Sequence, residues 1–150
     1  MINLDQIDNK ILRALSNDGR ISNLHLAEKV GLSPSACLRR VQDLEKKQII
    51  KGYRAVIDNS KLGKDITAFI TVGLNSHQKQ DQENFERIIK EAKDVTECHN
   101  ITGSYEYLLR VECKDLEAFK EFHTEILGTI PKVDKITTHI CMESPKDLRG

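Results

Sequence analysis

The sequence predicts an α+β protein in two parts, a helical part over residues 1–60 and a mixed part of strands and helices over residues 61–150. Two observations support this division. The first sixty residues hold three short apolar patterns at helical spacing, each preceded by a helix-capping residue. The remainder alternates short β-branched stretches with amphipathic ones. The stretch DNSKLG, residues 58–63, is rich in turn-forming residues and is the predicted linker.

Composition places the chain among globular proteins. Its 150 residues are enough to bury a core, and apolar residues make up 39% and charged residues 31% of the chain. No apolar run approaches the roughly 20 residues that a membrane-spanning helix needs. The start, MINLDQIDNK, has neither the basic nor the apolar region of a secretion signal. We therefore expect a cytoplasmic protein without a membrane partner.

The distribution of charge is uneven along the chain. Overall, 23 basic residues balance 23 acidic ones. Residues 1–60 hold 10 Lys and Arg against 7 Asp and Glu, whereas residues 61–150 hold 13 against 16. The helical part is thus the basic part, and a polyanionic partner is compatible with it.

Capping residues give the order of the helical part. Asp5 is the predicted N-cap of the first helix, and Ser22 that of the second, which ends at Gly31. Ser33 followed by Pro34 predicts the start of a third helix only a few residues later. Two short helices joined by a tight turn that contains glycine are typical of a helix-turn-helix motif, whose second helix enters the major groove of DNA.

The third helix has a buried face and a polar, basic face. Cys37, Val41 and Leu44 form its predicted buried stripe. At about 100° per residue, the opposite face carries Ser35, Arg39, Gln42 and Lys46. Arg39 is therefore predicted to contact phosphate or a base edge. Arg40 lies on the flank of the buried stripe, so both a phosphate contact and an ion pair within the helical part are open to it.

The stretch IIKGYRAVID, residues 49–58, is rich in β-branched and aromatic residues. It predicts a strand, either a wing of the helix-turn-helix unit or a strand that leaves it. The helical part is accordingly predicted to be a winged helix-turn-helix domain.

The second part reads as βαββαβ. Strands are predicted in DITAFITVGL, VTECHNITG, YEYLLRVEC and VDKITTHICME, and helices in ENFERIIKEA and LEAFKEFHTEIL. One face of the second helix is predicted to carry Leu116, Phe119, His123, Ile126 and Leu127. This order predicts a ferredoxin-like domain, with a four-stranded antiparallel sheet and both helices on one face. The other face needs a cover, which predicts at least a dimer.

Few residues suggest metal or catalytic chemistry. The four cysteines, Cys37, Cys98, Cys113 and Cys141, are scattered in apolar stretches and are interpreted as buried thiols. His139 and Cys141 share a strand face, but a metal site needs ligands that the spacing does not supply. No nucleophile elbow, phosphate-binding loop or metalloprotease motif occurs. We therefore expect no metal, no cofactor and no enzyme activity.

The hairpin ITGSYEYLLRV offers a possible ligand site. Gly103 and Ser104 are predicted to form a tight turn, with Tyr105 and Tyr107 on one strand face and Glu106 directed the other way. The carboxylate can pair with a ligand ammonium while the N–H groups of the turn bind a carboxylate, which together match a free amino acid. The alternative is a structural hairpin with a solvated glutamate.

The sequence as a whole resembles the Lrp/AsnC family of feast/famine transcription regulators. The resemblance is carried by LDQIDNKILRALSNDGRIS, LAEKVGLSPSACLRRVQDLEKKQIIKGYRAVID, LGKDITAFITV and GSYEYLLRV, in the order and spacing of the family. It implies a DNA-binding domain joined to a domain that binds small effectors, often amino acids, and that assembles into dimers and commonly octamers.

Individual positions match the motifs of the family. Ser33, Ser35, Arg39 and Arg40 match its recognition helix, and Gly103, Tyr105 and Glu106 match its effector loop, with Thr138 and Ile140 in the last-strand region near the effector. Two residues depart from the pattern. Glu106 stands where the family usually has Asp, which places the carboxylate about 1.5 Å deeper, and His25 stands where a capping glutamate is common.

Two other functions are compatible with the same frame. Sirohaem decarboxylases resemble this family, but such an enzyme needs cationic and imidazole groups around a large apolar cleft and does not need a basic face on the third helix. An architectural DNA-binding protein would differ from a regulator only in its low sequence selectivity. The regulator accounts best for the basic face.

Overall fold

The computed structural model describes residues 3–147, which form two compact units that separate between Val56 and Ile57. None of the helices in this range is long and apolar enough to cross a membrane. Asn59 donates a hydrogen bond of 2.6 Å to Glu112 of the second unit. The second unit thus begins a few residues before the predicted division at residue 60.

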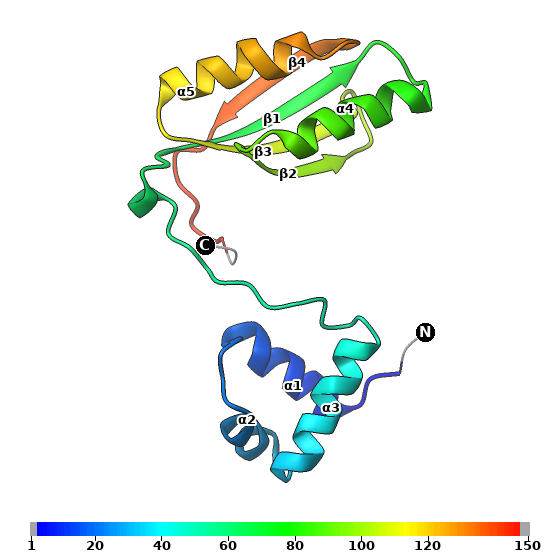
Figure 1. The fold of residues 1–150 in the computed structure, drawn as a ribbon, viewed down its shortest axis with the longest axis vertical. Helices are drawn as coiled ribbons and strands as arrows, with labels where there is room; N and C mark the ends of the chain where they lie inside the picture. Colours follow the sequence, from blue (N-terminus) through cyan, green and yellow to red (C-terminus); the bar gives the residue numbers. More distant parts are fainter. Residues whose placement is uncertain (1–2, 148–150) are drawn as a thin grey trace. The chain divides into compact units, whose positions relative to one another are not determined.

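The first unit contains three helices, α1 (Gln6–Asn17), α2 (Asn23–Val30) and α3 (Pro34–Lys46) (Figure 1). They enclose a small apolar core, to which Ile49 and Ile50 add partly buried side chains. The fully or almost fully buried residues of this core are Ile11, Ala14, Leu26, Ala27, Val30, Cys37 and Leu44. One face of α3 packs against this core, and the opposite face of α3 is exposed.

The helix ends follow the predicted capping chemistry. The Asp5 side chain accepts a hydrogen bond from the Asp8 N–H, and the Asp8 side chain accepts one from the Asp5 N–H, forming a capping box. Ser22 and Ser33 cap α2 and α3 with their hydroxyl oxygens, which accept the N–H groups of His25 and Ala36. Gly31 ends α2 with φ 76°, a left-handed conformation that favours glycine. The turn between α2 and α3 is therefore encoded locally.

The strand predicted over residues 49–58 is not observed. Residues 51–58 have no regular secondary structure, and Tyr53, Val56 and Ile57 are exposed. A strand is defined by its hydrogen bonds to a neighbour, and no such neighbour lies in the described part of the chain. The β-branched composition was therefore not sufficient to form a strand here.

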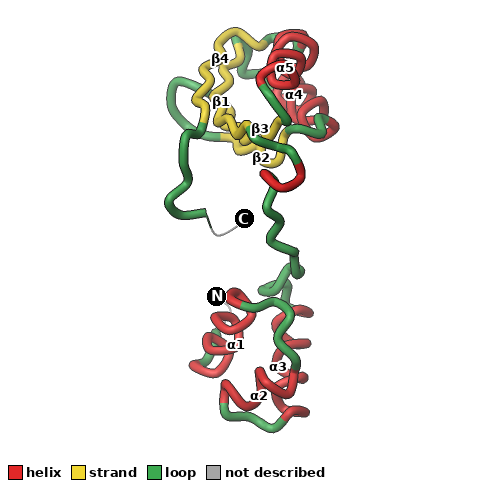
Figure 2. The backbone as a smooth tube through the Cα atoms, turned by 90° about the vertical axis from the view of Figure 1, so that its left-hand side faces the viewer, coloured by secondary structure: helices red, strands yellow, loops and turns green. Residues whose placement is uncertain are grey.

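The second unit has the predicted βαββαβ order. Its strands are β1 (Ile66–Leu74), β2 (Val95–Asn100), β3 (Tyr107–Cys113) and β4 (Val133–Ile140), and its helices are α4 (Lys79–Glu91) and α5 (Leu116–Glu121). The strands pair antiparallel in the order β2-β3-β1-β4. Figure 2 shows α4 and α5 on the same side of this sheet, which is the ferredoxin-like arrangement.

Strand register separates the two faces of the sheet. Ala68, Ile70 and Val72 of β1 are fully buried in the core beneath the helices. The alternate residues of β1 and their partners lie on the other face, where Phe69 is paired with Arg110. We call this second surface the open face, because α4 and α5 do not cover it.

The end of α5 differs from the prediction. A π-helical turn, Phe122–Ile126, follows α5, and a short 3₁₀ helix, Leu127–Thr129, follows that turn. Phe122 follows Phe119 by three residues, and both pack toward the core. Phe122 is buried at 2% exposure, whereas Leu116, predicted on the buried face, is 64% exposed. His123 is only partly buried.

The cysteines do not share one environment. Cys37 and Cys113 are buried as predicted, Cys141 is half-buried, and Cys98 is an exposed residue of the edge strand β2. Although the residue as a whole is exposed, Cys98 borders a cavity beside Glu86, where desolvation of the thiol and then the Glu86 carboxylate raise its pKa to about 11. At neutral pH this cysteine is therefore a protonated thiol, a poor nucleophile and metal ligand.

Candidate nucleic-acid interface and effector site

The outward face of α3 has the predicted composition. Cys37 and Leu44 are almost fully buried against α1 and α2, and Val41 is partly buried. The predicted opposite face is exposed, comprising Ser35, Arg39, Gln42 and Lys46. Helical geometry alone therefore identified the exposed polar face correctly.

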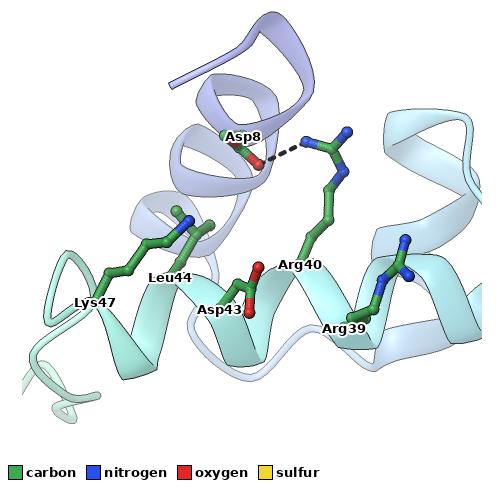
Figure 3. A pocket seen from close by; sticks show the side chains of 6 residues that line it. All are labelled: Asp8, Arg39, Arg40, Asp43, Leu44 and Lys47. Carbon is green, nitrogen blue, oxygen red and sulfur yellow. Dashed lines mark hydrogen bonds and ion pairs between the residues drawn. The ribbon is translucent and has the colours of Figure 1, made fainter. Parts of the chain in front are cut away.

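The two adjacent arginines have different surroundings. The Arg40 guanidinium lies 2.6 Å from Asp5 and 2.9 Å from Asp8, so it is held by the first turn of α1. Figure 3 shows Arg40 directed toward Asp8 and Arg39 directed away from it. Arg39 is exposed and makes no hydrogen bond or ion pair with another residue in the range 3–147. Of the two alternatives for Arg40, the structure contains the ion pair.

The Arg40 contact is part of the α1 cap. The hydrogen bond from the Asp8 N–H, followed by the one from Arg40, lowers the pKa of Asp5 below its ordinary value of 3.8. The same pair of carboxylates raises the pKa of Arg40. A polar cavity of about 260 Å³ adjoins this cluster, lined by Asp8, Arg39, Arg40, Asp43, Leu44 and Lys47 (Figure 3). The cluster therefore fixes α1 against α3.

The first turn of α3 is fixed by a second set of contacts. Ser33 accepts the N–H of Ala36, and its hydroxyl lies 3.3 Å from that of Ser35. The Asn23 side chain of α2 donates to the Pro34 carbonyl at 2.8 Å. Asn23 was not predicted as a functional residue, because it meets its partner only when α2 and α3 pack together. These bonds set the angle at which the outward face of α3 is presented.

The predicted effector loop joins β2 to β3. It is a longer connection than the tight turn that was predicted. It runs over residues 101–106 and is closed by a hydrogen bond from the Ile101 N–H to the Glu106 carbonyl. Gly103 and Ser104 are exposed within it. Their N–H groups are thus at the accessible tip of the loop.

Glu106 folds back from this loop onto β1. Its Oε2 accepts the N–H of Leu74 at 2.7 Å, where the register of β1 and β4 shifts. Its Oε1 lies 3.9 Å from Nδ1 of the exposed His77. One carboxylate oxygen is therefore committed to the sheet, and the other faces His77. Neither neighbour was predicted, because Leu74 and His77 are distant from Glu106 in the sequence.

The two hairpin tyrosines lie on opposite faces, contrary to the prediction. The Tyr107 hydroxyl donates to Glu86 of α4 at 3.0 Å, whereas the Tyr105 hydroxyl is bonded to the Thr137 hydroxyl of β4 at 2.6 Å. Tyr107 begins β3 and Tyr105 still belongs to the loop, so strict alternation does not apply between them. Tyr105 is consequently directed to the open face.

The two residues predicted in the last strand do not lie on the same face of the sheet as Tyr105. Thr138 is paired with the buried Ile70, and Ile140 with Ala68, so both are on the helix-covered side of the sheet. The β4 residues that approach the loop are instead Thr137 and Lys135.

Gly73 permits a close approach at this point. A Cβ at this position would be 3.2 Å from Cβ of Lys135 and 3.6 Å from both Oε2 of Glu106 and the Tyr105 ring. A larger residue would push against the side chains that surround the loop. Glycine therefore allows Tyr105 and Glu106 to lie against β1.

Residues 3–147 contain no group of three or more His, Cys, Asp or Glu side chains that could hold a metal ion. His139 is exposed on β4, and the Cys141 thiol lies 3.3 Å from the Ser144 hydroxyl.

Comparison with known proteins agrees with both units. Residues 4–51 match the model of a winged helix-turn-helix DNA-binding domain, and residues 67–150 match that of the Lrp/AsnC ligand binding domain. The chain is 38% identical to the transcriptional regulator AzlB of Bacillus subtilis, over 97% of this chain and 92% of that protein. It is 36% identical to the leucine-responsive regulatory protein of Escherichia coli, over 95% and 87%.

Solved structures show the same relationship. A transcriptional regulator of Neisseria meningitidis in complex with L-Met matches with a TM-score of 0.92 and 32% identity, covering 97% of this chain and 94% of the other. AsnC of Escherichia coli matches with a TM-score of 0.88 and 27% identity, covering 97% of each chain. On this combined evidence from sequence and structure, the chain belongs to the Lrp/AsnC family of DNA-binding transcription regulators.

Proposed function

We propose that α3 reads the operator from the major groove, with Arg39 as its principal contact. The observation that carries this assignment is the difference between the two arginines. Arg40 is neutralised by two carboxylates, whereas Arg39 is exposed and unpaired among the described residues. An unpaired guanidinium on an outward helix face can make two hydrogen bonds to guanine or bind a phosphate.

The remaining residues of α3 have complementary roles in this proposal. Gln42 follows Arg39 on the same exposed face and is suited to a base edge, and Lys46, near the end of the helix, is suited to a phosphate. Ser33 and Ser35 lie at the start of α3, where hydroxyl and N–H groups can bind a phosphate. Arg40 is a positioning residue that holds α3 against α1.

The test compares two exposed arginines. Arg39→Ala and Arg13→Ala remove the same charge, but Arg13 lies on α1 and borders a different cavity from Arg39. Duplexes selected from a random pool by the wild type serve as the operator. At matched salt, Arg39→Ala is expected to weaken binding by about 1–3 kcal/mol, and Arg13→Ala to leave it nearly unchanged. Equal affinities of wild type and Arg39→Ala would reject the assignment.

We further propose that an amino acid is the effector and that the 101–106 loop binds it. The support is chemical: the Glu106 carboxylate has one oxygen not used by the Leu74 N–H, and the loop tip offers backbone N–H groups. These two groups match the ammonium and the carboxylate of an α-amino acid. The L-Met complex of the Neisseria relative supports the same class of ligand.

The open face of the sheet supports self-association through the second unit. Phe69 and Leu108 are only partly buried there, although both are large apolar residues. A second copy of the same face would cover them and give a two-fold symmetric dimer. Further association of dimers into octamers is the expectation from the family resemblance. Sedimentation velocity with and without amino acids distinguishes these states, and a monomer under all conditions would reject the proposal.

A further inference from the structure

The outward face of α3 contains one residue that its polar character does not explain. Leu38 is 46% exposed, whereas most of the other apolar side chains of α3 point toward the core. It follows Ser35 by three residues and precedes Gln42 by four. Residues at these spacings lie on one side of a helix. Leu38 is therefore an apolar element within the exposed face that also carries Arg39.

An apolar side chain on a DNA-reading helix has one distinctive partner. The major-groove edges of the base pairs are mostly hydrogen-bond donors and acceptors, and the C5-methyl group of thymine is their apolar feature. Leucine has no polar group that could bind any other part of that edge. Burial of a methyl group against it removes apolar surface from water on both sides.

We propose that Leu38 is a specificity-determining residue that contacts the methyl group of a thymine in the operator. The inference rests on the proposed role of α3 in the major groove. It goes beyond that role because it assigns one base, at one position of each half-site, to one side chain. Arg39 and Gln42 flank Leu38 on the exposed face, so the contacted thymine lies within the stretch of bases that these residues read.

The test removes only the methyl group from the DNA. Each thymine of a selected operator is replaced in turn by deoxyuridine, at symmetry-related positions together, which keeps every hydrogen-bonding group. For the wild type, one replacement is expected to weaken binding about fourfold per half-site, the change in Kd that corresponds to burial of one methyl group. For Leu38→Ala, this replacement is expected to have no effect on Kd.

Two further variants isolate the contact. Leu38→Met keeps an apolar side chain of similar length and is expected to keep the sensitivity to the methyl group. Leu116→Ala removes a leucine that is 64% exposed in the second unit and is expected to behave as the wild type. Leu38 is exposed, so its replacement leaves the core of the first unit intact, which circular dichroism and a thermal melt check directly.

The possible failures are distinguishable. Wild-type protein that binds the unmodified operator but responds to no deoxyuridine replacement overturns the thymine contact and leaves the DNA-binding role of α3 in place. Full methyl sensitivity in Leu38→Ala also overturns it, because another residue must then make the contact. Wild-type protein that binds no selected duplex rejects the proposed function, and the thymine contact with it.

Discussion

Among single residues, two neighbours of the same type can have different roles. Arg39 and Arg40 are adjacent and chemically identical, yet one is exposed and the other is bound to two aspartates of α1. The angular difference of about 100° between consecutive helical residues is the physical reason. Arg40 faces α1, and Arg39 faces outward.

Protonation of Asp5 is expected to loosen this contact. The folded pKa of Asp5 is lowered, chiefly by the hydrogen bond from the Asp8 N–H and then by Arg40. The stabilisation that it provides is therefore complete above its ordinary pKa of 3.8 and is lost as the pH falls through the lower folded value.

Calorimetric melts of the wild type and Asp5→Asn from pH 7 to pH 3 measure the effect, because asparagine keeps the cap but not the charge. The wild type is expected to have the higher Tm at pH 7, with the difference shrinking below about pH 4. A constant difference over this range would contradict the prediction. Arg40→Met is the matched variant and should show a weaker pH dependence than the wild type.

Glu106 carries the residue-scale prediction for the effector. Glu106→Gln keeps an oxygen that can accept the Leu74 N–H but removes the charge that would pair with a ligand ammonium. It is expected to weaken amino-acid binding by about 1.5–3 kcal/mol, the value of a hydrogen bond to a charged group, and to leave DNA affinity without effector unchanged.

Titration calorimetry against the twenty amino acids measures the first effect. Glu106→Asp restores the usual family residue with a shorter reach, so a changed order of preferred amino acids would show that side-chain length sets selectivity. Identical binding by all three forms would mean that the Glu106 side chain has only the structural role of accepting the Leu74 N–H.

Among the elements, the segment that runs from α5 through the π-helical turn contributes several residues to the core, but Leu116 is not one of them. Phe119 and Phe122, three residues apart, pack toward the core, whereas Leu116 at the start of α5 is exposed. Substitutions of Phe122 and Leu116, two large apolar residues of the same helical segment, should therefore differ in their effect on stability.

Phe122→Ala is expected to destabilise the second unit by about 3–5 kcal/mol, because it leaves a cavity in the core. Leu116→Ala is expected to change stability by no more than about 0.5 kcal/mol, because its side chain is exposed. Urea denaturation of the full chain, monitored with a spectroscopic probe in the second unit, compares the stabilities of the two variants. Equal costs would contradict the observed burial.

At the scale of the whole molecule, the division between the units predicts which fragments are stable. Asn59 precedes the sheet in sequence but bonds Glu112, which is 5% exposed and is also bonded to Arg110. A fragment that starts at residue 57 keeps this partner, and one that starts at residue 61 loses it.

The longer fragment is expected to be more stable by about 1–3 kcal/mol, because the shorter one leaves a buried carboxylate oxygen without its donor. Chemical denaturation of both fragments measures the difference, and Asn59→Ala in the full chain serves as the control. Both fragments are expected to self-associate, because both contain the open face. Equal stability would place the start of the second unit at the sheet itself.

Features that depend on neighbours along the chain could be predicted from the amino-acid sequence. Caps at Asp5, Ser22 and Ser33, the left-handed Gly31, the exposed face of α3 and the βαββαβ order all follow from local spacing, because helix and strand periodicity is a local property. These features are sufficient to give the fold class and the candidate DNA-binding face.

Features that depend on residues distant in sequence became apparent only in the folded protein. Arg40 reaches Asp5 across 35 positions, and Glu106 reaches Leu74 across 32. The stretch 49–58 has the composition of a strand but no strand neighbour in the described chain, and Phe122 replaces Leu116 in the core. Each of these contacts depends on which side chains come together when the chain packs. The periodicity of the sequence contains no information about which residues those are.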